Sequence, residues 1–319
     1  MPSALGPVDT EHNKAKDFGR VFCSTLTHFR DPDGRSWGDC AKYLDQTEPA
    51  QPQREFATPY RWLFVSGFGD DCLNDVRAFS SSIAHLKSAH QITVEYFSVA
   101  PYGASEENGR SIARHIEDGW ATDAEHKYVL VGYDKGAADL LDALRALNLP
   151  ATKVAALVTI AGTVGGTWVP ESYRALKGPA QLWMASGCPS NVSDGLQNLT
   201  RDVRQRFLRE NPMPVPGYSI VASSPLGDTS TVFRESWKVL AGYAIEQDGL
   251  MVGWEALLPG AKYLGMAHAD HWAIALPFSE LPQPPKGIDH NRYPRDALFE
   301  AIVRYVSTDV AASEAKPGA

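Results

Sequence analysis

Several kinds of feature are missing from this sequence, and each absence excludes a class of protein. No run of apolar residues approaches the roughly 20 that span a bilayer, so the chain is not expected to cross a membrane. The net charge is −8 and the lysines and arginines are scattered, which leaves no basic patch for a phosphate backbone. Internal repeats and low-complexity tracts are absent as well. We therefore expect a globular protein with neither a membrane span nor a nucleic-acid partner.

Cysteine is also scarce. The four cysteines are Cys23, Cys40, Cys72 and Cys188, without a CxxC pair or a His/Cys spacing suited to zinc. The sequence thus predicts neither a metal site nor a bound cofactor. Residues 1–16 are polar and contain no signal-peptide core, which predicts a cytoplasmic protein if Met1 is the natural start. If a leader was removed from an exported precursor, Cys23 and Cys40 would be free to form a disulfide.

The length and composition suit one α/β domain that carries an insertion. The chain has 319 residues, of which 44% are hydrophobic and 21% charged, enough to bury a large core without a second full domain. Residues 1–58 show little periodicity, and we expect them to form an extension that wraps the core. Within this extension, residues 1–20 resemble a poorly ordered polar tail. The domain itself is expected at 59–319.

From residue 60 onward, apolar runs alternate with helical patterns. Strands are predicted at 60–65, 92–97, 153–160, 218–222 and 261–266, helices at about 72–88, 107–119, 201–209 and 294–307, and a strand with its helix at 127–148. Such alternation predicts a mostly parallel sheet flanked by helices. It lapses between about 163 and 212, where we expect a helical cap insertion.

The segment 128–144 organises the rest of the chain. Its apolar strand ends in Gly132-Tyr133-Asp134-Lys135-Gly136, and a helical pattern begins at once. A turn of this kind strains the residue at its centre, and the glycines let neighbouring main chains come close. We therefore expect Asp134 to stand above the sheet edge, at the N-terminus of a helix.

Two more polar residues follow later strands. Asp248 lies in an Asp-Gly turn, which projects its carboxylate from a tight bend. His271 lies in the short loop after the last predicted strand. A surface turn and a structural histidine are the ordinary alternatives, and Glu246 and His268 compete for the two positions.

Together these motifs resemble an α/β-hydrolase of the lipase or esterase type over residues 60–306. The motifs are Phe64-Val65-Ser66-Gly67-Phe68-Gly69, the Gly132–Gly136 elbow, Asp248-Gly249 and Asp270-His271-Trp272-Ala273. The order Asp134, Asp248, His271 matches the order nucleophile, acid, histidine in that superfamily. The resemblance implies hydrolysis of a carboxylic ester or related acyl bond by Ser-His-Asp-type chemistry. The backbone N–H groups of Phe68 and Lys135 would form the oxyanion hole.

The chain departs from its relatives at the nucleophile itself, because their elbow reads Gly-Tyr-Ser-Lys-Gly. Asp134 would pair with His271, block the base and repel an oxyanion, so we expect this form to be inactive or impaired, whether drift or engineering replaced the serine.

One alternative is attack of Asp134 on an alkyl carbon, as in epoxide hydrolases and dehalogenases. Lys135 in place of a halide-binding tryptophan, and Ser66-Gly67-Phe68-Gly69 in place of His-Gly-x-Pro, argue against it. The other alternative is a non-catalytic ligand-binding homologue.

The substrate is expected to be a small molecule with an apolar acyl or alkyl part. Its candidate contacts are the cap aromatics Trp168, Tyr173 and Trp183, for which core packing is an equal alternative. Lys135 and Arg110 are candidate contacts for an anionic group, although each is ordinarily a solvated charge. The sequence does not define the oligomeric state.

Overall fold

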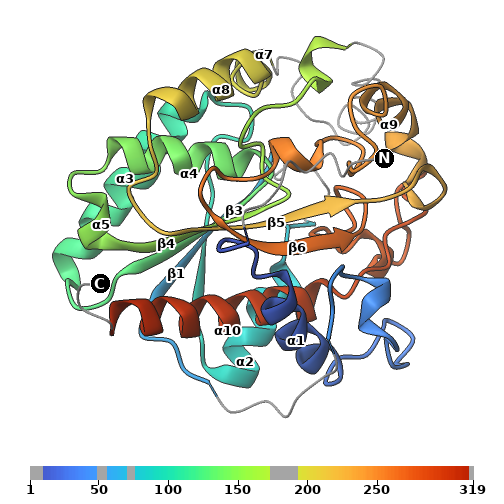
Figure 1. Cartoon of the computed structure of the whole chain (residues 1–319), viewed down its shortest axis with the longest axis horizontal. Coiled ribbons are helices and arrows are strands. Elements are labelled where there is room, and N and C mark those ends of the chain that lie inside the picture. Colours follow the sequence, from blue (N-terminus) through green and yellow to red (C-terminus); the bar gives the residue numbers. More distant parts are fainter. Residues whose placement is uncertain (1–9, 49–55, 70–75, 173–192, 316–319) are drawn as a thin grey trace.

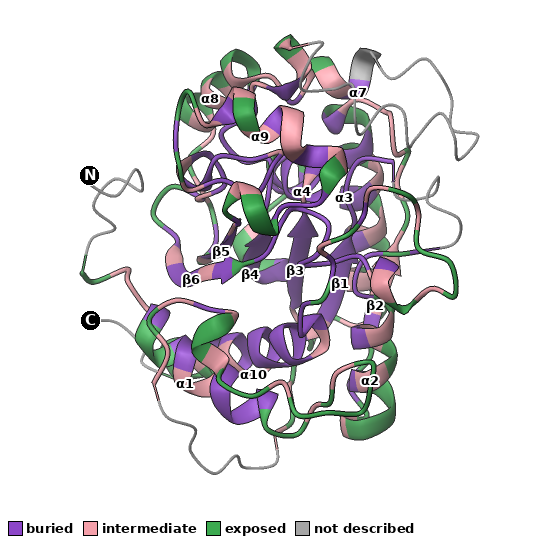
Figure 2. Cartoon of the chain, turned by 90° about the vertical axis from the view of Figure 1, so that its right-hand side faces the viewer, coloured by how far each residue is buried: buried purple, intermediate pink, exposed green. Residues whose placement is uncertain are grey.

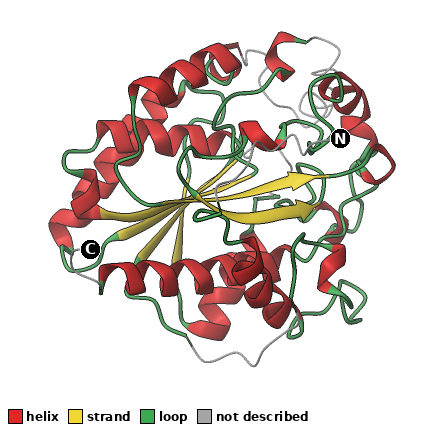
Figure 3. Ribbon diagram, viewed as in Figure 1, coloured by secondary structure: helices red, strands yellow, loops and turns green. Residues whose placement is uncertain are grey.

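The computed structural model contains a six-stranded sheet with helices on both faces (Figure 1). It describes residues 10–48, 56–69, 76–172 and 193–315. The strands are β1 (Arg61–Val65), β2 (Val94–Phe97), β3 (Tyr128–Tyr133), β4 (Val154–Ile160), β5 (Gly217–Ser223) and β6 (Lys262–His268). They follow the order β2-β1-β3-β4-β5-β6, and all neighbouring pairs are parallel. Every strand therefore ends at the same edge of the sheet, and the predicted parallel sheet flanked by helices is confirmed (Figure 3).

The helices form two layers. One contains α3 (Ser105–Thr122), α4 (Lys135–Ala146), α5 (Pro150–Lys153) and α8 (Arg201–Glu210), and the other contains α1 (Ala15–Leu26), α2 (Ser80–His90) and α10 (Arg295–Glu314) (Figure 1). Two short helices, α7 (Ser193–Gln197) and α9 (Arg234–Leu240), are also among the described residues. Among the described residues, none of the helices combines the length and the apolar composition that crossing a bilayer requires.

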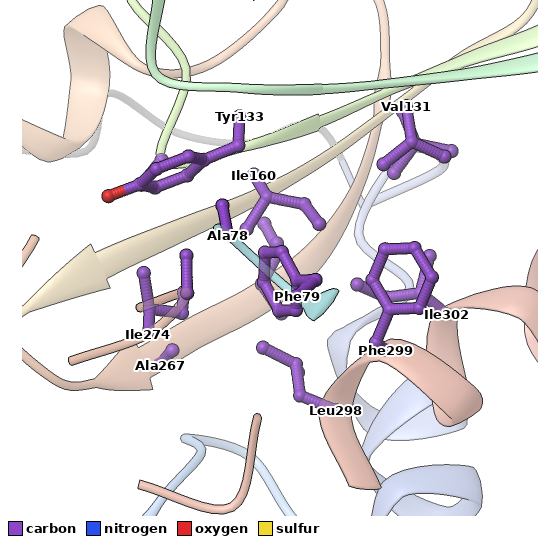
Figure 4. Packing of buried hydrophobic residues seen from close by; sticks show 14 of the residues in the cluster. Ala78, Phe79, Val131, Tyr133, Ile160, Ala267, Ile274, Leu298, Phe299 and Ile302 are labelled. Atoms are coloured by element: carbon purple, nitrogen blue, oxygen red, sulfur yellow. The ribbon is translucent and has the colours of Figure 1, made fainter. Parts of the chain in front are cut away.

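Both faces of the sheet are buried, which explains why its strands read as continuous apolar runs. Successive side chains point to opposite faces of a strand. In β1, Trp62 and Phe64 belong to the core beneath α1, α2 and α10, while Leu63 and Val65 belong to the core beneath α3 and α4. Figure 4 shows the first of these cores, where Phe79 and Phe299 pack with ring centroids 4.9 Å apart. Figure 2 shows that the strands are buried while much of α2 is exposed.

Helix α1 was not expected. Phe18 and Phe22 are fully buried on one side of it, and Phe18 meets Tyr305 of α10 edge-on, with centroids 5.8 Å apart. The prediction of a polar tail was therefore wrong for residues 15–20, because two aromatic residues at helical spacing suffice to dock a helix in a polar stretch. A disulfide between Cys23 and Cys40 ties α1 to the segment that follows it.

The N-terminal residues also cover the free edge of β6. The N–H group of Lys14 donates to the carbonyl of Tyr263 over 2.9 Å, and the N–H group of Asp45 donates to the carbonyl of Met266 over 3.0 Å. An unpaired edge strand is a template for aggregation. Residues before the first strand thus satisfy backbone groups that the sheet leaves open.

Helix α2 begins later than its periodicity predicted. The predicted helix at 72–88 included Phe79, but this residue has a φ of 54°, outside the right-handed helical region. The helix starts at Ser80. Phe79 is nevertheless fully buried, so its apolar side chain is part of the hydrophobic core although the residue lies before the helix.

Candidate active site

The turn between β3 and α4 has the strained geometry that its sequence predicted. Asp134 is the single residue between Tyr133 and Lys135, with φ of 50° and ψ of −124°, a conformation that costs free energy for a residue with a side chain. A Cβ atom at Gly136 would lie 2.2 Å from the carbonyl oxygen of Val65. Only glycine allows this approach of the main chains, which brings Asp134 over the end of the sheet.

The Asp134 carboxylate occupies the group of N–H donors predicted as an oxyanion hole. Its Oδ2 atom accepts the N–H group of Phe68 over 2.8 Å, and the N–H group of Lys135 also bonds the carboxylate. A Cβ atom at Gly67 would lie 2.5 Å from Oδ2. Thr163 donates its hydroxyl to Oδ1 over 3.0 Å. The N–H groups of Phe68 and Lys135 therefore converge on one point, and the group that they bond there is the carboxylate of Asp134.

His271 and Asp248 meet on the other side of this carboxylate. His271 Nδ1 lies 2.7 Å from Asp248 Oδ2, and Asp248 Oδ1 accepts the N–H groups of Leu250 and Met251 over 2.9 and 2.7 Å. Both side chains are buried. Because a carboxylate only accepts hydrogen bonds, Nδ1 carries the proton of this bond. Asp248 is thereby fixed by its own turn and holds the imidazole in place.

The free nitrogen of His271 points toward Asp134. His271 Nε2 lies 3.5 Å from Asp134 Oδ1, the distance of an ion pair and too long for a good hydrogen bond. The imidazole stacks on the ring of Tyr133, with centroids 5.3 Å apart. The competitor His268 is exposed, and its Nδ1 lies 3.2 Å from the carbonyl oxygen of Lys42. The structure thus brings His271 to the elbow and leaves His268 outside.

Two carboxylates hold His271 in its protonated form. Burial lowers the pKa of His271, but the charges of Asp248 and Asp134 and the hydrogen bond with Asp248 outweigh burial and raise it to about 10. Burial raises the pKa of Asp134, but the imidazolium and the N–H groups of Phe68 and Lys135 bring it below its ordinary value. At neutral pH the pair is therefore an imidazolium and a carboxylate. An imidazolium has no lone pair with which to accept a proton.

Neither a protein-family model nor a curated protein matches the chain. The crystal structure of the metagenomic carboxyl esterase MGS0156 does match, with a TM-score of 0.81 and 28% sequence identity over 97% of each chain. The chain has the α/β-hydrolase fold. The lipase BlEst2 of Bacillus licheniformis in its mature form is also similar, with a TM-score of 0.57 and 16% identity over 80% of this chain and 96% of the lipase.

The two side chains predicted as candidate contacts for an anionic group, Lys135 and Arg110, both pair with carboxylates of the chain. The Lys135 side chain is 1% exposed, and its Nζ lies 2.7 Å from both carboxylate oxygens of Asp139. Asn108 of α3 donates to the same carboxylate over 2.8 Å. The Lys135 side chain is thus buried and paired within α4, and the bond that joins α3 to α4 is that of Asn108 to Asp139. Arg110 is solvated, beside Glu106 at 2.7 Å.

One of the predicted cap aromatics is described, and its contacts are those of packing. Trp168 stacks on Tyr243 with centroids 4.1 Å apart, and the guanidinium of Arg201 lies 3.9 Å from the centre of its ring. Two groups this close must cover opposite faces of the indole. Tyr173 and Trp183 lie outside the described residues. A substrate contact by any of the three stays a prediction, and the described surroundings of Trp168 favour packing.

Sequence reasoning missed two residues beside the elbow. Thr163, which bonds Asp134, follows β4 at the edge where all the strands end. That position was the signal, since side chains after neighbouring parallel strands meet there. Tyr102 meets the Phe68 ring edge-on at 5.0 Å. A Cβ atom at Gly195 of α7 would lie 2.8 Å from the carbonyl oxygen of Tyr102 and 3.0 Å from the Phe68 ring, so α7 borders both residues.

Proposed function

We propose that this chain is a carboxylic-ester hydrolase in its architecture, with Asp134 in the position of the serine nucleophile, and that this form is inactive or impaired. The observation that carries the proposal is the arrangement of the Asp134, His271 and Asp248 side chains. Asp134 stands at the elbow with His271 Nε2 3.5 Å from its Oδ1, while Asp248 holds the other nitrogen of the imidazole at 2.7 Å. Similarity to a carboxyl esterase over 97% of the chain supports the same reaction class.

Each remaining group has a role if a serine hydroxyl stands at residue 134. His271 Nε2 takes the hydroxyl proton as the oxygen attacks the ester carbonyl, and later gives it to the leaving alcohol. Asp248 orients the imidazole and stabilises its charge. The N–H groups of Phe68 and Lys135 bond the oxyanion of the tetrahedral intermediate. No metal or cofactor is required by this reaction.

Asp134 interferes with two of these roles at once. Its Oδ2 atom already accepts the Phe68 N–H group that an oxyanion needs. Its charge keeps His271 protonated at neutral pH, so the base is blocked. Attack of the carboxylate on an ester would also give an anhydride, a higher-energy intermediate than an ester. These three effects act in one direction, toward loss of esterase activity.

Similarity to a carboxyl esterase supports a carboxylic ester as the substrate class. We infer a small-molecule carboxylic ester whose acyl or alkyl part is apolar, because pockets that bind such groups are lined mainly by apolar and aromatic side chains. Phe68 and Tyr102, which pack edge-on beside the Asp134 carboxylate, support the apolar part.

The substitution Asp134→Ser tests the proposal. It should create hydrolysis of a p-nitrophenyl ester at least about 10²-fold above the wild-type protein, and a serine-directed phosphonate should abolish that activity. Asp134→Asn is the matched control, since it removes the charge but supplies no nucleophile. A folded Asp134→Ser variant with no gain in hydrolysis would overturn the proposal.

A second function is supported by the position of the carboxylate, whose Oδ2 accepts the Phe68 N–H group while Oδ1 lies 3.5 Å from His271 Nε2. If Asp134 Oδ1 attacks an epoxide carbon, a C–O bond forms, the ring C–O bond breaks and the alkoxide takes the proton of the His271 imidazolium. Oδ2 then becomes an ester carbonyl that already accepts the Phe68 N–H group. Esterification also removes the charge of Asp134, so the pKa of His271 falls and the imidazole can activate water.

Single-turnover reaction of an epoxide in ¹⁸O-labelled water separates the two functions. Hydrolysis through Asp134 leaves one labelled oxygen in the aspartate, which peptide mass spectrometry detects. An unlabelled Asp134 after turnover contradicts this second function. If neither epoxides nor esters react in any form of the protein, a non-catalytic ligand-binding role is what remains.

A further inference from the structure

A cluster of two histidines and one carboxylate joins α2 to α10, on the opposite helical layer from α4 (Figure 1). His85 Nε2 and His90 Nε2 lie 2.8 and 3.1 Å from the same oxygen, Oε2 of Glu300. None of these side chains belongs to the Asp134 site. Two imidazole nitrogens and a carboxylate oxygen that converge on one point form the donor set of many zinc sites.

We propose that His85, His90 and Glu300 bind a divalent transition metal, and that Zn²⁺ fits this donor set best. The three ligand atoms lie within 4.8 Å of one another. Zinc bonds of about 2.0–2.2 Å place tetrahedral ligand atoms about 3.3 Å apart, so small side-chain movements complete the geometry. A water molecule would take the fourth position. Imidazole and carboxylate together disfavour Ca²⁺ and Mg²⁺, which prefer oxygen ligands.

The surroundings orient the three ligands before a metal arrives. Arg304 donates its Nε to Glu300 Oε1 over 2.7 Å, which directs the other oxygen at the histidines. The ring of His85 packs on Phe29 and the ring of His90 on Phe56, with centroids 4.7 and 5.2 Å apart. Such outer contacts are typical of metal sites, where they fix ligand orientation.

The site is also open to an entering ion. The side chain of Glu300 is 4% exposed, while those of His85 and His90 are 33% and 22% exposed. An ion can therefore reach the nitrogens from solvent and meet the buried carboxylate behind them. Because the ligands come from α2 and α10, bound zinc would crosslink two helices that already pack together.

Titration calorimetry of the full chain with ZnCl₂ near pH 7.5 tests the site. The wild-type protein should bind one Zn²⁺ per chain, and both His85→Gln and His90→Gln should weaken binding at least tenfold. His126→Gln is the matched control, because His126 is exposed and paired with Asp123, and it should bind zinc as the wild type does. Circular dichroism without metal checks that each variant folds.

Two further variants keep the outcome decisive. Arg304→Gln leaves all three ligands in place and should weaken zinc about 10–100-fold, the usual cost of losing an outer contact. Asp134→Ser should bind zinc with unchanged affinity, which separates this site from the elbow. The proposal is wrong if the wild type and the His85→Gln/His90→Gln double variant bind equal zinc, or if Asp134→Ser removes the binding.

Discussion

Two clusters in this molecule combine histidine with carboxylate in opposite proportions. At the elbow, one imidazole, His271, lies between two carboxylates, Asp134 and Asp248. Between α2 and α10, one carboxylate, Glu300, lies between two imidazoles. Two carboxylates around one imidazole hold a proton on it, whereas two imidazoles around one carboxylate supply three ligand atoms for a cation that displaces the Nε2 protons. The same two residue types therefore predict a blocked base in one place and a metal site in the other.

The contrast also explains what one substitution would do. Replacing Asp134 by serine restores the ratio of one carboxylate to one imidazole, which is the ratio of a working triad. It removes a charge, frees the N–H group of Phe68 and supplies a hydroxyl. No comparable change at Glu300 would create a catalyst, because the cluster between α2 and α10 has no nucleophile and no elbow.

The largest expected effect is the fall in esterase rate when His271, the proposed base, is removed from a variant that has serine at residue 134. In an Asp134→Ser background, His271→Ala should lower p-nitrophenyl ester hydrolysis by about 10²–10⁴-fold, the usual contribution of a general base. Initial rates at saturating ester measure the difference. His268→Ala in the same background is the control, because His268 is exposed and away from the elbow. Equal losses in the two variants would show that His271 is not the base.

Zinc should stabilise the protein through the α2–α10 cluster. At a free Zn²⁺ concentration a hundred times its dissociation constant, linkage adds about 2.7 kcal/mol to the free energy of unfolding. Urea denaturation with zinc and with a chelator measures this gain. The gain should vanish in His90→Gln and persist in His126→Gln. A zinc-independent unfolding curve for the wild type would contradict the cluster's role.

The pKa of His271 should fall when the second carboxylate is removed. The folded value of about 10 lies above the ordinary value of 6.5, so its contribution to stability is complete below pH 6.5 and is lost as pH rises toward 10. Asp134→Asn should lower the pKa by at least about one unit, or about 1.4 kcal/mol. NMR titration of the imidazole measures both values, and equal values would remove Asp134 as a cause.

The smallest expected effect concerns the close contact between Gly67 and the Asp134 carboxylate. Gly67→Ala places a methyl group 2.5 Å from Oδ2, which should displace the side chain and cost about 1 kcal/mol of stability. In Gly67→Ala/Asp134→Ser the cost should be smaller but not absent, because serine lacks the carboxylate but keeps the Cβ atom that the methyl group meets at 2.7 Å. Urea denaturation of the four proteins gives the coupling, and strict additivity would contradict the contact.

The sheet and the elbow were predictable because local sequence determines both. Apolar runs such as Val154–Ile160 are buried on two faces and mark parallel strands without knowledge of their partners. The Gly-x-Asp-x-Gly turn requires close backbone contact, and few other residues allow it. Asp248 and His271 followed from their positions after later strands, where parallel topology makes distant residues meet.

Contacts between distant segments were not predictable in the same way. Lys135 looked like a solvated charge because its partner Asp139 and the neighbour Asn108 become buried only once α3 packs on α4. The sequence also gave no sign of a metal site. His85 and His90 are five residues apart, which is not a usual helical ligand spacing, and Glu300 lies 215 residues from His85.

Helix α1 shows a third limit of prediction from the sequence. Its buried face contains Gly19, Ser24 and Thr25 as well as Phe18 and Phe22, so apolar residues alone do not outline the helix in the sequence. The helix is held by α10, β6 and the Cys23–Cys40 disulfide. Tertiary contacts of this kind supply most helical stability in proteins, and a sequence window does not contain them.

Reaction with a serine-directed phosphonate, read by intact-protein mass spectrometry, tests most directly whether Asp134 alone keeps this elbow from working as a serine hydrolase. Asp134→Ser should gain the mass of one phosphonyl group per chain, while the wild type and Asp134→Ser/His271→Ala stay unlabelled. Peptide mapping should place the label at residue 134. A folded Asp134→Ser protein that stays unlabelled, or a wild type that is labelled, would contradict the claim.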